Sequence, residues 1–378
     1  MAKYIQRSIS EKLLEVHQYY PVTVITGPRQ SGKTSLCKHL FPEYNYVNLE
    51  DLSKRAIAHD DPTSFIRSLG SKAIIDEVQN VPELLSMIQV YVDENPELKY
   101  VLTGSSNFKL LHSVSQSLAG RAGLFTLLPL SLKEMDLSEK EIPTGQLLTR
   151  GQYPGIISNG IPAEIFYPNY YTTYVERDVR DIMNLKSILK FDTVVRLIAA
   201  RTGSEFNASQ ISKEAGVSSV TVSEWLSILE VSYITFTLKP FHANIPKQLT
   251  KMPKVYFHDT GLLCYLLGIE TEEQFLSSPM KGAIFENMVI SELMKSRYNA
   301  GRIPDMSFYR ERSGKEVDAI VTEKGKRHLY EIKAGATYRK DYSANMDYLA
   351  TQIPSVDQTT VVYDGPSVPP SIINIRDI

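Results

Sequence analysis

Eight consecutive residues limit the possible folds of this chain more than any other feature of its sequence. They follow the pattern G-x-x-x-x-G-K-[ST] and are Gly27, Pro28, Arg29, Gln30, Ser31, Gly32, Lys33 and Thr34. The β-branched run Val22–Thr26 precedes them and the helical stretch Ser35–Leu40 follows. Strand, loop and helix thus come in the order that a phosphate-binding loop requires. The pattern predicts such a loop in an α/β domain; the alternative is a surface turn that matches by chance.

Further apolar runs predict the sheet to which this loop belongs. Short runs that are apolar on both faces indicate strands of a buried parallel sheet. They are Val22–Thr26, Tyr46–Leu49, Ala73–Ile75 and Tyr100–Thr103, with a fifth at Leu124–Leu130.

The residue types in the loop suit a nucleotide and its metal ion. The glycines allow the backbone to curl so that successive N–H groups point inward, and the start of the helix adds partial positive charge. Lys33 supplies a cation for the β- and γ-phosphates, and Thr34 is placed to hold Mg²⁺. We count Ser35, the next residue, among the candidate nucleotide contacts. ATP and Mg²⁺ are therefore the predicted cofactors.

An acidic pair stands at the end of a predicted strand. Asp76 and Glu77 directly follow Ala73–Ile75. Hydrolysis on a phosphate loop needs a carboxylate for the metal ion and a group that orients water, so we assign Asp76 to the metal side and Glu77 to the water. The alternative for Asp76 is a helix cap at a strand-to-helix junction.

Two further positions could complete a nucleotide site. A sensor of the γ-phosphate is expected where the fourth strand ends, and the choice stays open between Thr103, Ser105 and Asn107, since Ser and Thr also form turns there. Arg121 follows Gly120 just before the fifth strand. Such an arginine can stabilise charge on a neighbouring subunit's γ-phosphate, which implies a homo-oligomer, or it can be a structural guanidinium at a helix end.

Composition sets the broad class of the protein. A length of 378 residues exceeds the size at which one hydrophobic core keeps growing, so we expect more than one domain. A composition of 43% hydrophobic and 22% charged residues excludes the collagen-like and disordered classes of protein. The formal charge of −2 means that any contact with nucleic acid must come from a local patch. Two cysteines cannot build a disulfide framework, and no apolar run approaches the roughly 18 residues of a membrane span. We expect a cytoplasmic protein without membrane contact.

The motifs together resemble a known family. Gly27–Thr34, Asp76-Glu77, Leu102–Ser106 and Leu118–Arg121 are similar to the predicted AAA+ ATPases of bacteria and archaea, in which an ATPase core is fused to a C-terminal domain of unknown function. The resemblance continues through Tyr170–Asp178, Thr221–Glu230, Lys254–Gly268, Gly282–Leu293 and Glu316–Lys333.

This resemblance implies three domains. Residues 1–155 would form a P-loop AAA+ ATPase domain, residues 156–245 a helical winged-helix-like domain, and residues 246–378 a connector with a restriction-endonuclease-like, PD-(D/E)XK-type α/β domain. By position, Lys33 and Thr34 would bind phosphate and magnesium, and Arg121 would be the arginine finger.

A helix–turn–helix pattern occupies the middle of the chain. Between residues 207 and 229 apolar residues fall on packing positions, Gly216 stands at the turn, and Ser232–Leu238 would begin a wing. From Ala215 to Leu238 there is no Lys or Arg. A recognition helix without cations lacks phosphate contacts, so we favour a protein-interaction or lid module over DNA binding.

Four residues near the C-terminus fit a metal-dependent nuclease site. Glu286 is expected on a helix, Asp318 on a strand, and Glu331 with Lys333 on the next strand, where a spacing of two places both on one face. Carboxylates with a lysine can hold Mg²⁺ and activate water for phosphodiester cleavage, and the order matches the D…E-x-K pattern of the restriction-endonuclease-like fold. The alternative for Glu331 and Lys333 is an exposed ion pair.

An ATPase is common to the functions that remain open. The first is an ATPase whose nucleotide state controls a nuclease-like domain that acts on DNA or RNA. The alternative is an ATP-dependent switch or assembly protein whose C-terminal domain is a catalytically inactive binding module for nucleic acid or a protein partner. A motor that moves along nucleic acid is a third, for which no pore-loop signature is present. Lys324, Lys326 and Arg327 are among the basic residues that make the C-terminal region the candidate nucleic-acid contact.

Overall fold

The computed structural model of the chain consists of two compact units. It describes residues 4–105, 117–135, 141–175, 188–241, 252–311, 315–368 and 370–378. Unit 1 comprises Met1–Leu130, Val231–Tyr233 and Tyr298–Arg302, and unit 2 comprises Ser131–Glu230, Ile234–Arg297 and Ile303–Ile378. The division into domains at residues 155 and 245 stays a prediction.

Unit 1 is built on a five-stranded parallel sheet, as the apolar runs predict. Its strands are β1 (Val22–Thr26), β2 (Asn45–Asn48), β3 (Lys72–Asp76), β4 (Lys99–Gly104) and β5 (Ala122–Thr126). They lie in the order β2-β3-β4-β1-β5. The fifth strand ends at Thr126 rather than continuing to Leu130, because the chain from Leu127 onward leaves the sheet next to the loop that follows β1.

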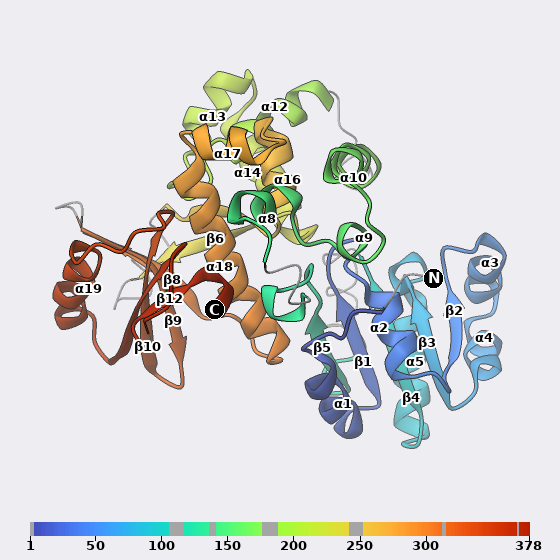
Figure 1. Cartoon of the computed structure of the whole chain (residues 1–378). Helices are drawn as coiled ribbons and strands as arrows, with labels where there is room; N and C mark the ends of the chain where they lie inside the picture. Colours follow the sequence, from blue (N-terminus) through green and yellow to red (C-terminus); the bar gives the residue numbers. More distant parts are fainter. Residues whose placement is uncertain are drawn as a thin grey trace. The chain divides into compact units, whose positions relative to one another are not determined.

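Helices cover both faces of this sheet (Figure 1). On one face α1 (Ser10–Tyr19) and α2 (Lys33–Leu40) pack their buried side chains against Ile25, Ile74 and Val101. On the other face the core contains Val24, Ile75 and Leu102 together with apolar residues of three helices. These helices are α3 (Leu52–Asp60), α4 (Pro62–Leu69) and α5 (Glu83–Glu94). Alternate residues of each strand therefore enter different cores, which explains why the strands are apolar on both faces.

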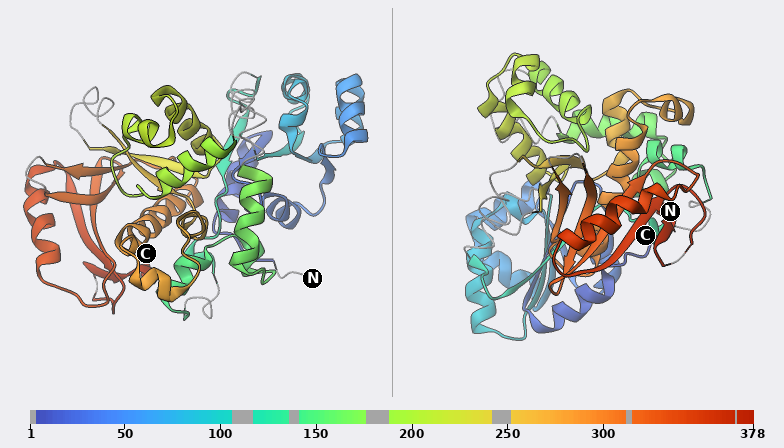
Figure 2. Two further views of the ribbon diagram at one scale, coloured as in Figure 1. Left: turned by 90° about the horizontal axis from the view of Figure 1, so that it is seen from above. Right: turned by 90° about the vertical axis from the view of Figure 1, so that its left-hand side faces the viewer.

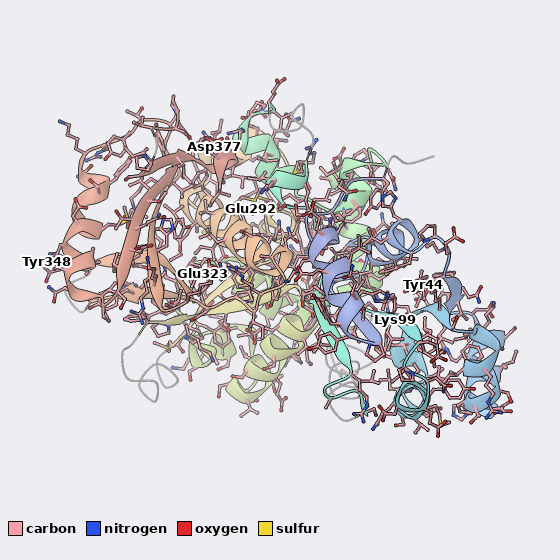
Figure 3. The ribbon with its side chains drawn as sticks, turned by 90° about the horizontal axis from the view of Figure 1, so that it is seen from below. Tyr44, Lys99, Glu292, Glu323, Tyr348 and Asp377 are labelled. Carbon is pink, nitrogen blue, oxygen red and sulfur yellow. The ribbon has the colours of Figure 1, made fainter. Side chains whose placement is uncertain are left out.

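Unit 2 contains a mixed seven-stranded sheet in the order β12-β11-β10-β9-β8-β6-β7. The strands are β6 (Thr235–Pro240), β7 (Lys254–Phe257), β8 (Met306–Arg310), β9 (Glu316–Glu323), β10 (Lys326–Lys333), β11 (Val356–Tyr363) and β12 (Ile372–Asn374). The C-terminal strands, red in the views of Figure 2, have α19 (Asp341–Gln352) packed on one face through Met346 and Leu349. Figure 3 labels Tyr348 on this helix and Glu323 at the end of β9.

Helices make up much of the rest of the described part of unit 2. They include α8 (Thr144–Arg150), α9 (Pro154–Ile157), α10 (Ala163–Tyr170), α12 (Ile188–Ala199), α13 (Ala208–Ala215), α14 (Ser219–Val231), α16 (Thr260–Leu267), α17 (Glu272–Ser277) and α18 (Lys281–Asn299). Gly216 caps α13 with φ +63°, a left-handed conformation that glycine adopts without strain, and α14 begins three residues later. In the part of the chain that the structure describes, no helix is both long and apolar enough to cross a bilayer.

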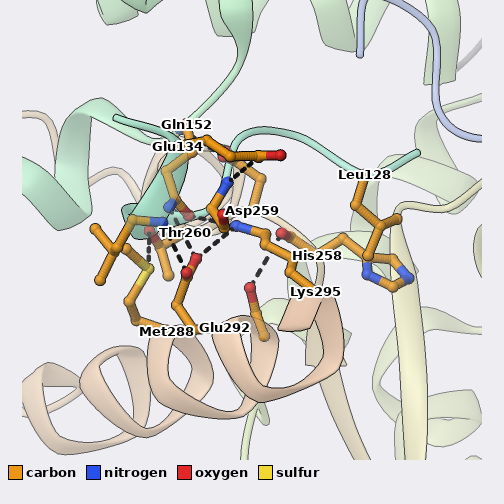
Figure 4. Close-up of polar contacts among 12 residues, drawn as sticks. Leu128, Glu134, Gln152, His258, Asp259, Thr260, Met288, Glu292 and Lys295 are labelled. Atoms are coloured by element: carbon orange, nitrogen blue, oxygen red, sulfur yellow. Dashed lines mark hydrogen bonds and ion pairs between the residues drawn. The ribbon is translucent and has the colours of Figure 1, made fainter. Parts of the chain in front are cut away.

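A buried polar network joins three segments of unit 2 (Figure 4). Lys295 on α18 donates to Gln152 Oε1 at 2.5 Å and to Glu292 Oε1 at 2.9 Å. Asp259, which caps α16, accepts hydrogen bonds from the backbone N–H of Gln152 and of Leu262. Because these charged groups are almost fully buried, each needs its partners to offset the loss of hydration. The network therefore fixes the segment after α8 against α16 and α18.

Candidate functional site

The phosphate-binding loop lies between the end of β1 and the start of α2. Gly27 has φ +143°, and a Cβ atom there would lie 2.1 Å from the carbonyl oxygen of Leu127. Gly32 caps α2 with φ +95°, and Gln30 adopts φ +60°. Only glycine tolerates the first position, because any side chain would overlap the backbone after β5. The glycine spacing of the motif is thus required by the local backbone path.

Lys33 is the first residue of α2 and is almost fully buried. Its ammonium donates to the carbonyl oxygens of Gly27 at 3.0 Å and Pro28 at 2.8 Å, so it closes the loop on itself. Burial lowers the pKa of Lys33 below its usual value, and the carboxylates of Glu77 and Asp76 act in the opposite direction. The hydrogen bonds of Lys33 go to neutral carbonyls, so its ammonium can still form a charge-assisted hydrogen bond with a phosphate group.

The other loop residues differ in exposure. Pro28 and Ser31 are buried, Arg29 is partly exposed and lies 3.6 Å from the Glu50 carboxylate, and Gln30 and Ser35 are exposed. The hydroxyl of Ser31 is buried and has no hydrogen-bond partner among the described residues. Such an orphaned donor fits a loop that receives phosphate oxygens.

Asp76 gathers three hydroxyl groups at the end of β3. Its Oδ2 accepts hydrogen bonds from the hydroxyl groups of Thr34 at 2.7 Å and Tyr46 at 2.8 Å. Its Oδ1 accepts a hydrogen bond from the hydroxyl group of Thr103. Mg²⁺ is usually held by one or two protein oxygens together with substrate phosphates and water, so the Thr34 hydroxyl and the Asp76 carboxylate fit this ion. Tyr46 is a contact that sequence reasoning missed. Burial first, and then the Asp76 carboxylate, raise the pKa of its phenol.

Glu77 lies next to the predicted sensor position. It has φ +55°, and its Oε2 accepts hydrogen bonds from the side chains of Gln79 and Ser105, the latter at 2.9 Å. The side chain is therefore held at the end of β4 rather than turned into solvent. Thr103 and Ser105 both contact the acidic pair, whereas Asn107 lies outside the described residues.

Arg121 does not approach the loop of its own chain. It immediately precedes β5, whose first residue Ala122 pairs with Val22 at the amino end of β1, while the loop follows the carboxyl end. Its guanidinium binds Asp93 through two hydrogen bonds of 2.5 and 2.7 Å. Any role at a γ-phosphate would have to be played on another copy of the chain.

Arg7 supports the loop, and no motif indicated it. Its guanidinium is almost fully buried and donates to the carbonyl oxygens of Ser31 and Leu128, both at 2.7 Å. It thereby joins the phosphate loop to the segment after β5. Arginine donates in several directions at once, which suits a buried position between two backbone segments.

We predict that Arg7→Met destabilises unit 1 and weakens binding of MgATP. Hydrogen bonds from a charged donor are worth about 1.5–3 kcal/mol, so the free energy of unfolding should fall by about that amount. Urea unfolding and nucleotide titration measure the two effects. The exposed Arg67→Met on α4 is the matched control and should change stability by no more than about 0.5 kcal/mol. Unchanged unfolding and binding of Arg7→Met would show that the contacts do not hold the loop.

A second polar cluster lies in unit 2. Glu286 on α18, Asp318 on β9, and Glu331 and Lys333 on β10 come together as the strand pattern predicts, and Lys254 on β7 joins them. Lys333 binds Glu331 Oε1 at 2.5 Å, and the Ile332 N–H donates to Asp318 Oδ2 at 2.7 Å. Burial, then Glu286 and Glu331, raise the pKa of Asp318 well above its usual value.

This cluster does not have the arrangement of a metal site. Lys254 Nζ lies 3.2 Å from Glu286 Oε1 and 2.5 Å from Glu316 Oε1, and Tyr256 OH donates to Glu286 at 2.6 Å. Within the described ranges, no group of three or more His, Cys, Asp and Glu side chains is placed to hold a metal ion. The predicted Mg²⁺ at Glu286, Asp318 and Glu331 therefore does not fit the side chains as they stand. Sequence reasoning missed Lys254 because β7 is distant from the D…E-x-K strands in the chain.

Family comparisons divide the chain into three matched regions. Residues 19–136 match an AAA domain family. Residues 144–273 and residues 281–376 match two domains of unknown function, DUF8612 and DUF4143. The first match agrees with the parallel sheet and the phosphate loop, so residues 19–136 form a P-loop NTPase core that is similar to AAA domains. The two others assign no activity.

Two relatives that match most of the chain are uncharacterised proteins. A protein of Mycobacterium tuberculosis is 28% identical over 340 residues, which are 88% of this chain and 74% of the relative. One of Methanocaldococcus jannaschii is 25% identical over 354 residues, 85% of this chain and 75% of that relative. Among solved structures, a Walker-type ATPase of Pyrococcus abyssi has a TM-score of 0.44 and 17% identity, covering 70% of this chain and 96% of its own.

Proposed function

We propose that unit 1 binds MgATP, hydrolyses it, and uses the nucleotide state to act on unit 2. The contact of Thr34 with Asp76 is the observation that carries this proposal, because it joins the phosphate loop to the acidic pair across the sheet. In the sheet, β4 lies between β1 and β3. The parallel register places the carboxyl ends of these three strands at the same edge of the sheet. Loop, acidic pair and sensor position consequently share one edge of the sheet, where ligands of parallel α/β sheets bind.

Each side chain then has a chemical role. Lys33 would exchange its hydrogen bonds with the loop carbonyls for contacts with the β- and γ-phosphates. Thr34 and Asp76 would hold Mg²⁺, which would neutralise negative charge on the phosphates. Glu77 orients and polarises the attacking water, while Ser105 keeps the Glu77 carboxylate in place. Thr103 and Ser105 are the candidate sensors of the γ-phosphate. Arg121 acts on the γ-phosphate of a neighbouring copy, so the active form is a homo-oligomer.

Tyr233 supports the coupling of nucleotide state to unit 2. It belongs to unit 1, and its hydroxyl is within 2.7 Å of Thr26 Oγ1, directly before the phosphate loop. In the chain it stands between α14 and β6, which both belong mainly to unit 2. A change at the loop can therefore reach the helical segment and the large sheet through the covalent chain.

For the C-terminal part we favour a binding module, with a nuclease as the second candidate. The order α18-β8-β9-β10-α19-β11 and the carboxylate cluster favour the restriction-endonuclease-like fold. The ion pairs of Lys254 weigh against a metal-dependent site. The order α12-α13-α14 followed by the antiparallel pair β6-β7 favours a winged-helix-like middle domain.

A basic groove in the C-terminal part is the proposed contact with nucleic acid. It has a volume of about 400 Å³, and its lining includes Arg297, Lys324, Lys326, Arg327 and His328. Glu323 and Asp357 also line it and pair with Arg297 and Lys326. The excess of cations suits a phosphate backbone, to which Arg and Lys contribute most of the affinity.

We predict Mg²⁺-dependent ATP hydrolysis without strand cleavage. The purified chain should release phosphate from ATP in Mg²⁺ and not in EDTA. In the same preparation, single-stranded, duplex and branched DNA and RNA should stay intact in Mg²⁺ or Mn²⁺, with and without ATP. Cleavage that disappears in Asp318→Ala/Glu331→Ala would instead establish the nuclease. Absence of hydrolysis in folded protein that binds ATP would contradict the ATPase.

A further inference from the structure

The carboxylate cluster of unit 2 already contains cations of its own. Four acidic side chains converge from three elements: Glu286 from α18, Glu316 and Asp318 from β9, and Glu331 from β10. Two lysines lie among them, Lys254 from β7 and Lys333 from β10. In a metal-dependent site of this type a divalent ion supplies the positive charge at the centre of the carboxylates.

Lys254 is placed where such an ion would be shared. Its side chain is only 4% exposed, and its ammonium lies 2.5 Å from Glu316 Oε1 and 3.2 Å from Glu286 Oε1. Oxygens that bind one Mg²⁺ lie about 2.0–2.1 Å from it, so ion and ammonium could not occupy the space between these two carboxylates together. Burial disfavours the charged form of Lys254, but Glu286, Asp318 and Glu316 outweigh that effect and raise its pKa.

The backbone of Lys254 is held on both sides. It pairs with Leu238 of β6 in the antiparallel ladder and forms a bridge with Glu205 on the other side. Phe308 lies beside the ammonium, 5.2 Å from ring centroid to Nζ. To vacate the cluster, the ammonium would have to leave both carboxylates, which is costly for a buried charge.

We propose that Lys254 is a built-in counter-ion that takes the place of a divalent metal in this cluster and keeps the wild-type site closed to Mg²⁺ and Mn²⁺. Lys333 does the same for Glu331 Oε1, and both of these residues lie on β10. The other oxygen of Glu331 is buried and has no hydrogen-bond partner among the described residues. It is the ligand that becomes available once a metal can enter.

This inference rests on the proposal that the C-terminal part is a binding module rather than a nuclease. The experiment below tests it independently of the proposed ATPase activity. Mn²⁺ binding is measured by calorimetry and by the paramagnetic signal of free Mn²⁺, on full-length protein without nucleotide. A failure of the ATPase proposal therefore leaves the result unaffected. The variants are Lys254→Met, which keeps the length of the stem and removes the charge, and Lys254→Met/Asp318→Asn, which also removes a carboxylate.

We expect wild type and Asp318→Asn to bind Mn²⁺ alike, because no site exists in the cluster. Lys254→Met should gain one Mn²⁺ site, about tenfold or more tighter than any Mn²⁺ binding of wild type, and Mn²⁺ should raise its unfolding temperature, since binding to the native state stabilises it. The double variant should lose this gain. The proposal is overturned if folded Lys254→Met binds no more Mn²⁺ than wild type. If Lys254→Met does not fold, the comparison of wild type with Asp318→Asn decides, since an Asp318-dependent Mn²⁺ site in wild type also overturns it.

Discussion

Lys33→Ala is expected to reduce ATP hydrolysis by at least about 10²–10³-fold, the usual cost of removing one preorganised group that stabilises transition-state charge. The alanine removes the buried ammonium at the start of α2 and leaves the carbonyls of Gly27 and Pro28 without their donor. Binding of ATP should weaken as well, because the same charge contacts the bound phosphates. Steady-state phosphate release and nucleotide titration measure the two effects.

The control for this variant is another lysine of unit 1. Lys54 on α3 is exposed, so Lys54→Ala should hydrolyse ATP like wild type. Circular dichroism and urea unfolding show whether Lys33→Ala keeps its fold. If folded Lys33→Ala hydrolyses ATP within a few-fold of the wild-type rate, the assigned phosphate loop does not take part in catalysis. That conclusion does not depend on the results for the other variants.

Glu77→Gln is expected to separate binding from hydrolysis. The amide keeps the shape of the side chain, and its oxygen can still accept the hydrogen bond from the Ser105 hydroxyl. The end of β4 should therefore remain ordered. It cannot polarise water as a carboxylate does, and hydrolysis should fall by about 10²–10⁴-fold, the range for loss of a general base. Affinity for MgATP should stay close to that of wild type, since Thr34 and Asp76 are untouched. Single-turnover kinetics with a parallel binding measurement test both statements.

The matched control is Glu94→Gln, at the exposed end of α5. It changes the same functional group on the surface of the same unit and should leave turnover unaltered. Full hydrolysis by Glu77→Gln would reject the role of Glu77 in orienting water. Loss of ATP binding together with turnover would instead make Glu77 a residue that maintains the site.

Much of unit 1 follows from local patterns in the chain. The strand before the loop, the glycines and the helix that begins at Lys33 are consecutive, and the predicted parallel sheet is confirmed. The expected fifth strand was too long at its carboxyl end: an apolar run shows that residues are buried, but not whether they pair in a sheet. Leu127 and Leu130 are buried outside the strand.

The sequence alone determined the phosphate loop and the residue types of the acidic pair. The reason is that the strand, the turn and the helix are each specified by residues only a few positions apart in the chain. Only the tertiary structure decided that Tyr46 and Thr103 share the Asp76 carboxylate, that Arg7 joins the loop to Leu128, and that Lys254 stands among the carboxylates of unit 2. The reason is physical. A buried charge must be paired, and its partner is whichever group the assembled strands bring within about 3 Å, however far away it lies in the chain.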